Sequence, residues 1–164
     1  MYLPFTNMPG HSRVWIYPSN RALTATDTVK ASELLHAFCE QWSAHGHPLN
    51  ASFRIDHDQF LVVTVDEKSS AASGCSIDAS VHIIRQIGAE LSVDFFDRTI
   101  IPFLKDGRIV RYPLKDLKSI FQNGIIGPQD QTFNLLAATK DEWETSGLVA
   151  VDKSWLARYL PATV

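Results

Sequence analysis

Six consecutive residues, Phe60-Leu61-Val62-Val63-Thr64-Val65, would present apolar or β-branched side chains on both faces of a strand. Such a run is typical of a strand buried on both sides, in the centre of a sheet. The preceding Phe53-Arg54-Ile55 instead alternates apolar and polar residues, as a half-buried strand does. The fold must therefore contain a sheet with other elements covering it.

Two amphipathic helices are expected to provide that cover. The first follows Thr26 or Asp27, either of which can cap it, and runs to about His45. Its apolar positions recur at helical spacing along one face, at Leu34, Leu35, Phe38, Cys39 and Trp42. The second helix runs from about Cys75 to Leu91, and its expected buried stripe consists of Ile77, Val81, Ile84 and Leu91.

The remaining strands complete a recognisable order. Residues 14–17 predict a first strand, and residues 99–104 and 108–112 predict a hairpin, because Asp106-Gly107 suits a tight turn with positive φ. The order is β-α-β-β-α-β-β. We therefore predict the α+β class, with a ferredoxin-like β-α-β-β-α-β core, an extra hairpin strand and a C-terminal extension.

The chain of 164 residues has the length of a single domain. Its core is expected at about residues 12–113 and its extension at about residues 114–164. Short helices are predicted at residues 114–122 and 154–160, the second of them capped by Ser154. No repeat or linker marks a boundary, so residues 1–164 are predicted to form one domain.

Composition excludes several functional classes. The formal net charge is −3, and 15 basic residues are scattered among 18 acidic ones, which argues against nucleic acid as a partner. No apolar stretch is long enough for a membrane span, and the N-terminus lacks the pattern of a signal peptide. We therefore expect a cytoplasmic protein with Cys39 and Cys75 as reduced thiols.

The segment from Ser69 to Asp78 is the strongest candidate site. It places a hydroxyl-rich loop at the start of a helix, where free backbone N–H groups and the helix dipole favour an anion. A small anionic ligand, such as a phosphate or a carboxylate, is the predicted occupant. The proposed binding residues are Ser73, Gly74, Cys75 and Ser76, joined by Asp66, His45 and His47.

Cys75, Asp78 and His82 are the candidate catalytic residues. They stand at i, i+3 and i+7 and therefore share one stripe of the second helix. A cysteine at a helix start loses its proton more readily than a free thiol. The alternative is purely structural: Cys75 or Ser76 caps the helix, and Asp78 and His82 form a solvated pair. Two helical turns also separate Cys75 from His82, a rise of roughly 10 Å.

Metal and nucleotide sites are not expected. His45, His47, Asp56 and His57 are close in sequence, but no Cys-x-x-Cys or His-Glu-x-x-His spacing occurs, so we predict no metal site. The chain also lacks a P-loop, a Gly-x-Gly-x-x-Gly fingerprint and a Gly-x-Ser-x-Gly elbow. The sequence therefore identifies no particular cofactor, and whether one is used stays open.

Four segments resemble a family of small bacterial proteins of about this length. They are residues 11–17, 42–49, 71–81 and 154–155. Members of this family often carry the label "ABC transporter ATPase". The chain has neither the P-loop nor the Leu-Ser-Gly-Gly-Gln-type signature of such an ATPase, so we expect no ATPase activity. The resemblance implies a bacterial cytosolic protein and no particular catalytic residue.

Two functions remain open from the sequence. The first is binding of a small ligand or anion at the segment from Ser69 to Asp78, with or without catalysis. The second is a non-catalytic protein–protein interaction module, such as a homodimer formed through an exposed sheet edge or face.

Overall fold

The computed structural model describes residues 1–162 and shows an α+β protein. The predicted class is therefore confirmed. The chain forms two compact units. Unit 1 contains residues 1–96 and 135–142, and unit 2 contains residues 97–134 and 143–164. The single-domain organisation stays a prediction, and each unit is described by itself.

A three-stranded antiparallel sheet forms the centre of unit 1. Its order is β1 (Arg13–Pro18), β5 (Phe60–Asp66) and β4 (Asn50–Asp56). The first six residues of β5 are buried. This confirms the prediction from the apolar run, because only a central strand has side chains covered on both faces.

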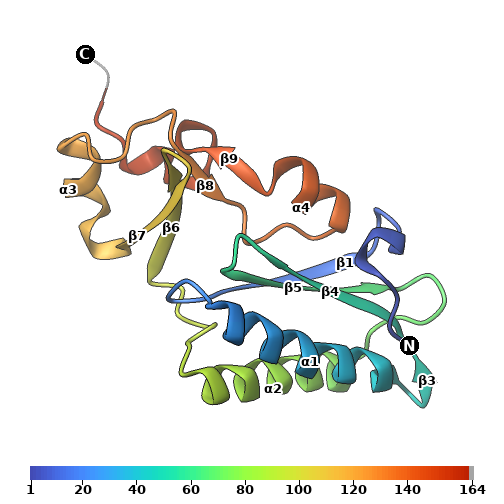
Figure 1. The fold of residues 1–164 in the computed structure, drawn as a ribbon. Coiled ribbons are helices and arrows are strands. Elements are labelled where there is room, and N and C mark those ends of the chain that lie inside the picture. The colour runs from blue at the N-terminus through green and yellow to red at the C-terminus, as the bar shows by residue number, and fades with distance from the viewer. Residues whose placement is uncertain (163–164) are drawn as a thin grey trace. The chain divides into compact units, whose positions relative to one another are not determined.

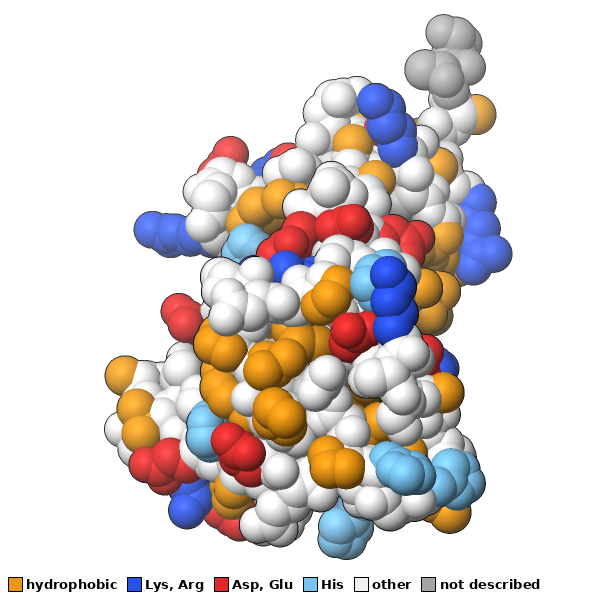
Figure 2. Space-filling view, turned by 90° about the vertical axis from the view of Figure 1, so that its right-hand side faces the viewer, with side chains coloured by type: hydrophobic (Ala, Val, Ile, Leu, Met, Phe, Trp, Pro, Cys, Tyr) orange, Lys and Arg blue, Asp and Glu red, His pale blue; other side chains and the backbone are white. Residues whose placement is uncertain are grey.

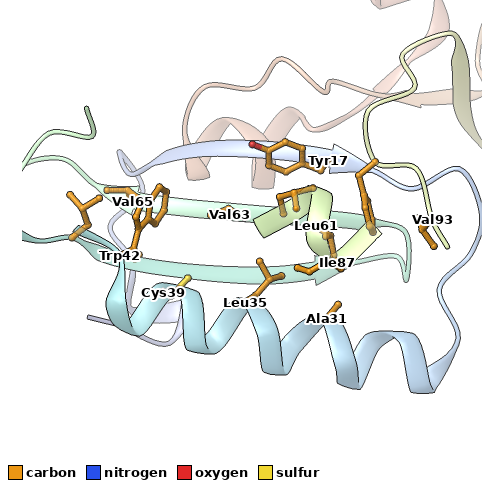
Figure 3. Close-up of a cluster of buried hydrophobic side chains, with 14 of the residues drawn as sticks. Tyr17, Ala31, Leu35, Cys39, Trp42, Leu61, Val63, Val65, Ile87 and Val93 are labelled. Atoms are coloured by element: carbon orange, nitrogen blue, oxygen red, sulfur yellow. The ribbon is translucent and has the colours of Figure 1, made fainter. Parts of the chain in front are cut away.

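Two long helices lie side by side along one face of this sheet (Figure 1). They are α1 (Ala25–Gln41) and α2 (Gly74–Leu91). Leu35 and Cys39 of α1, like Ile87 of α2, are fully buried and point toward the side chains of β5 (Figure 3). The apolar face predicted for the first helix is thus confirmed.

The ends of α1 differ from the prediction. Thr24 is its N-cap, and Asp27 completes a reciprocal capping box, so neither Thr26 nor Asp27 caps the helix itself. The helix ends at Gln41, about one turn before the predicted end. The chain then turns back through a small hairpin, β2 (Ser43–Ala44) and β3 (His47–Pro48), whose turn residues have positive φ.

The buried stripe of α2 contains Ile84, as predicted, but otherwise differs from the prediction. It consists of Ser76, Ser80, Ile84, Ile87 and Gly88, whereas Ile77, Val81 and Leu91 are only half-buried. The two serines can face the core because their hydroxyl groups bond to the helix itself, Ser76 to Ser73 O and Ser80 to Ile77 O. The spacing of apolar residues alone does not predict that these two serines are buried.

Unit 2 contains a second antiparallel sheet of order β7-β6-β8-β9. Its strands are β6 (Ile100–Lys105), β7 (Arg108–Pro113), β8 (Gln131–Phe133) and β9 (Leu148–Ala150). The predicted hairpin is confirmed, with Asp106 at φ 51° and Gly107 at φ 75°.

The ferredoxin-like arrangement is not clearly shown. In such a fold the sixth element would join the first sheet, but β6 pairs with β7 and β8 in the second one. The apolar side chains of β6 explain this difference, because Ile101 and Phe103 pack with Leu117 and Phe121 of α3 (Leu117–Gln122). The hairpin therefore has a hydrophobic core of its own.

Short elements complete the chain. They are α4 (Lys140–Ser146) and the 3₁₀ helices η1 (Phe5–Asn7), η2 (Leu114–Asp116), η3 (Val151–Lys153) and η4 (Trp155–Tyr159). Ser154 caps η4, as predicted, by accepting a hydrogen bond from Leu156 N at 3.1 Å. Within residues 1–162, no helix has the length and apolar character that a membrane span needs.

Candidate functional site

The start of α2 is held by a reciprocal capping box. Ser73 Oγ accepts from Ser76 N at 3.2 Å, and Ser76 Oγ accepts from Ser73 N at 2.7 Å. Ser76 Oγ also donates to Ser73 O at 2.8 Å, and Ser76 is buried. The hydroxyl of Ser76 therefore serves the helix, and only Ser73 keeps a hydroxyl hydrogen for another partner.

Two backbone amides at this helix start are open. The N–H groups of Gly74 and Cys75 make no hydrogen bond within the described part of the chain. Both residues are exposed, and no atom lies within 4 Å of the place where a Cβ of Gly74 would stand. Open amides at a helix start attract anions. Ligand binding here stays a prediction.

Two carboxylates of the loop that leads to α2 accept hydrogen bonds from the backbone of the same loop. Asp66 Oδ1 lies 3.1 Å from His11 Nε2 and accepts from Lys68 N at 3.1 Å. The Lys68 amide has the largest effect and lowers the pKa of Asp66; desolvation opposes it, and the hydrogen bond with His11 lowers the pKa further. Glu67 Oε1 accepts from Ala72 N at 3.0 Å, so the backbone donors of Lys68 and Ala72 are occupied within the loop.

An arginine and two tryptophans lie beside these carboxylates. Arg13 Nη1 is 3.5 Å from Glu67 Oε1, and its guanidinium stacks 4.7 Å from the ring centre of Trp15. Trp15 in turn lies 6.0 Å from Trp42, whose Nε1–H donates to Ser76 O at 2.9 Å. Trp42 thus ties α1 to the first turn of α2, which confirms its predicted packing role.

The candidate catalytic residues do not converge on a pocket. Cys75, Asp78 and His82 are all exposed, so the stripe they share faces solvent. His45 and His47 are exposed residues of the β2–β3 hairpin. Among residues 1–162, no three His, Cys, Asp or Glu side chains stand close enough to hold a metal ion.

One face of the protein shows how its charged side chains are distributed. On the face shown in Figure 2, lysine and arginine side chains are dispersed among acidic, histidine and apolar ones and form no continuous basic area. A hollow of about 450 Å³ in unit 1 lies at the far end of α2, bordered by Arg85, Gly88 and Phe96. This hollow is separate from the predicted ligand site.

The two cysteines should differ sharply in reactivity. Cys39 is fully buried, and burial raises the pKa of its thiol to about 12, whereas Cys75 is exposed. Because the thiolate is the reactive form, iodoacetamide at neutral pH should label Cys75 and spare Cys39. Peptide mass spectrometry of native and urea-unfolded protein measures this. Equal labelling of both cysteines in the native protein would contradict the assigned burial.

One edge of the first sheet is covered at the beginning of β1. Along the outer side of β1, Val14 N donates to Ala138 O at 3.0 Å, and Lys140 N donates to Ser12 O at 2.8 Å. Arg13 and Thr139 form a β-bridge between these bonds. Residues 138–140 therefore act as a short extra strand beside β1.

The other edge, along β4, is covered only at its beginning. Ala51 N donates to Met1 O at 3.0 Å, and Ala51 O accepts from Leu3 N at 2.9 Å. Because the hydrogen bonds of an antiparallel strand alternate between its two sides, Phe53 and Ile55 also direct their N–H and C=O groups outward. No hydrogen bond from any described residue reaches these four groups.

Comparison with known proteins gives no match: no family model, no curated protein and no solved structure is similar to this chain. The family resemblance expected from the sequence therefore stays a prediction.

Sequence reasoning missed two features of this region. His11 stands 55 positions from Asp66, so no local motif could connect them. The open edge of β4 was expected only in general terms, because its exposure depends on which distant segments cover the sheet. The alternation of Phe53-Arg54-Ile55 was the available signal, since it indicated a strand less buried than β5.

Proposed function

We propose that this chain is a non-catalytic protein-interaction module in which a partner strand adds to the outer side of β4. The observation that carries the proposal is the set of outward N–H and C=O groups at Phe53 and Ile55 that no described residue satisfies. Such an edge is a template for pairing with another chain.

The regular geometry of β4 supports this function. Residues 138–140 pair with the outer side of β1 at Arg13 and Val14, and the N-terminal segment pairs with the outer side of β4 at Ala51. Proteins usually protect open edges with prolines, bulges, charged side chains or covering segments. Of these, the open part of β4 carries the charged side chains Arg54 and Asp56, which pair with each other. The continuous register between β4 and β5 contains no bulge, and β4 contains no proline. The edge is therefore well formed for strand addition.

The side chains of β4 also give a partner something to recognise. Phe53 and Ile55 lie on the helix-covered face and are half-buried. Arg54 and Asp56 lie on the opposite face, where their side chains pair at 2.5 Å and 2.9 Å. An added strand would thus meet apolar groups on one face and a charged pair on the other, which provides specificity beyond the main-chain bonds.

A displayed library of random short peptides tests strand addition. Enriched peptides should slow hydrogen exchange at the Phe53 and Ile55 amides. Their binding should be lost in Ile55→Pro, because proline removes an outward donor while the bonds to β5 stay intact. Ile55→Ala is the matched control, since it removes the same side chain and keeps the amide.

Two results would overturn this function. One is a library that yields no binder, and the other is a set of binders that protects amides elsewhere and leaves Phe53 and Ile55 unchanged. Equal loss of binding in Ile55→Ala and Ile55→Pro would count against strand addition as well, because it would show that binding depends on the Ile55 side chain and not on its amide.

A further inference from the structure

We infer that the strand added to β4 is β4 of a second copy of this chain, antiparallel and centred on Ile55. This inference rests on the proposed function and names its partner. A two-fold axis beside Ile55 makes both copies use the same surface, as closed dimers do. In this arrangement the two Ile55 residues exchange both of their main-chain hydrogen bonds. Phe53 stands opposite His57, which lies beyond the end of β4 and has a positive φ, so the ladder between the copies consists of the Ile55 pair.

Charge complementarity selects this register. With Ile55 opposite itself, Arg54 of each copy stands directly opposite Asp56 of the other. These are non-hydrogen-bonded positions, where opposed side chains approach most closely. The two-fold axis thus brings the positive group of each strand opposite the negative group of the other strand. The edge is self-complementary in charge.

The neighbouring register is disfavoured by the same charges. Centring the pair on Arg54 would place the two Arg54 side chains directly opposite one another, and like charges at such positions are destabilising. It would also leave Asp56 opposite Ser52 of the second copy. Arg54 has limited freedom to move aside, because its guanidinium lies 4.2 Å from the ring centre of Phe5.

The existing Arg54–Asp56 bond is compatible with pairing. Arg54 Nε lies 2.5 Å from Asp56 Oδ1, and the two side chains are 36% and 15% exposed. They are therefore held in place before a second copy arrives, so little side-chain freedom is lost on pairing. In the dimer the four charges would alternate in sign across the two strands.

The free part of the edge is short, so the dimer should be weak. Ala51 is already paired with the N-terminal segment, and β4 ends at Asp56. Interfaces below roughly 1,200 Å² of buried surface belong to weak or transient complexes. We therefore expect reversible pairing that depends on protein concentration.

Sedimentation velocity over a wide range of protein concentrations tests the register. The samples are the wild type, Arg54→Asp, Asp56→Arg and the double variant with both changes. Each single change places like charges opposite one another in two cross-strand pairs, and should weaken dimerisation by about tenfold or more. The double variant restores both cross-strand pairs, and the pair within each copy, so it should dimerise like the wild type.

An equimolar mixture of the two single variants provides a second readout. The acidic edge of Arg54→Asp complements the basic edge of Asp56→Arg, so the mixture should form heterodimers. Heterodimer formation also shows that both variants are folded.

Three outcomes would overturn the inference. They are a wild type that stays monomeric at every concentration, single variants that dimerise as well as the wild type, and a double variant that stays monomeric. A monomeric wild type whose Phe53 and Ile55 amides are still protected by peptides would overturn the second copy as partner and leave strand addition standing. A monomeric wild type whose Phe53 and Ile55 amides are also not protected by peptides would overturn both proposals.

Discussion

Replacing Trp42 with alanine should lower the free energy of unfolding by about 3–5 kcal/mol, as large aromatic-to-alanine changes in a core do. Trp42 is 3% exposed, and its ring centre lies 4.8 Å from that of Phe38 and 6.0 Å from that of Trp15. Its indole N–H donates to Ser76 O at 2.9 Å. The change therefore removes packing and a bond between α1 and α2 together.

Trp42→Phe separates these two contributions. Phenylalanine keeps most of the packing and removes the donor to Ser76 O, so about 1 kcal/mol should be lost through the hydrogen bond alone. Urea denaturation followed by circular dichroism measures both variants, because this signal does not depend on tryptophan fluorescence.

Trp155 provides the matched control for Trp42. It is 49% exposed, and its ring contacts Tyr159 and Arg158 at the surface. Trp155→Ala should change the free energy of unfolding by no more than about 0.5 kcal/mol, as surface substitutions do. Equal losses in Trp42→Ala and Trp155→Ala would contradict the assigned role of Trp42 in the core.

Elements with a strong local signal could be predicted from the sequence. The continuous apolar run predicted β5, and Asp106-Gly107 predicted the hairpin turn, because each signal depends on adjacent residues only. The true cap of α1 also had a local signal, Thr24 with Asp27 three residues later. Choosing Thr26 or Asp27 as the cap overlooked that reciprocal pattern.

The sheet that contains β6 could not be predicted in the same way. Residues 99–112 indicate a hairpin, but the choice of sheet depends on the contacts of Phe103 with Phe121 and on the pairing with β8. These contacts join segments far apart in sequence. Element order alone therefore favoured a ferredoxin-like sheet that the structure does not clearly show.

In the candidate site, too, the features set by neighbouring residues were predicted and those set by distant segments were not. The start of α2 was predicted within one residue, but its cap is Ser73 and not Cys75 or Ser76, the two caps considered from the sequence. The partner of Asp66 and the open edge of β4 were not predicted, since each depends on where the N-terminal residues pack. Local chemistry identified where a helix begins, and tertiary pairing determined which groups stay open.

Gly88→Ala should lower the free energy of unfolding by about 1–3 kcal/mol, the usual cost of overpacking. A Cβ at this position would stand 2.6 Å from Val93 O, a backbone atom that cannot rotate away. Gly88 O also accepts from Val93 N at 2.9 Å, so the chain after α2 is fixed against this residue. Helix propensity alone favours alanine over glycine by about 1 kcal/mol. A net decrease in the free energy of unfolding would therefore come from the contact between the new Cβ and Val93 O.

Gly74→Ala is the matched control on the same helix. Its Cβ would meet no atom within 4 Å, and its φ is not in the left-handed region. Alanine should therefore stabilise the protein by about 0.4–1 kcal/mol, because it restricts the unfolded chain. Urea denaturation of both variants measures the difference. If Gly88→Ala were as stable as Gly74→Ala, the residues after α2 could not lie as close to Gly88 as the structure places them.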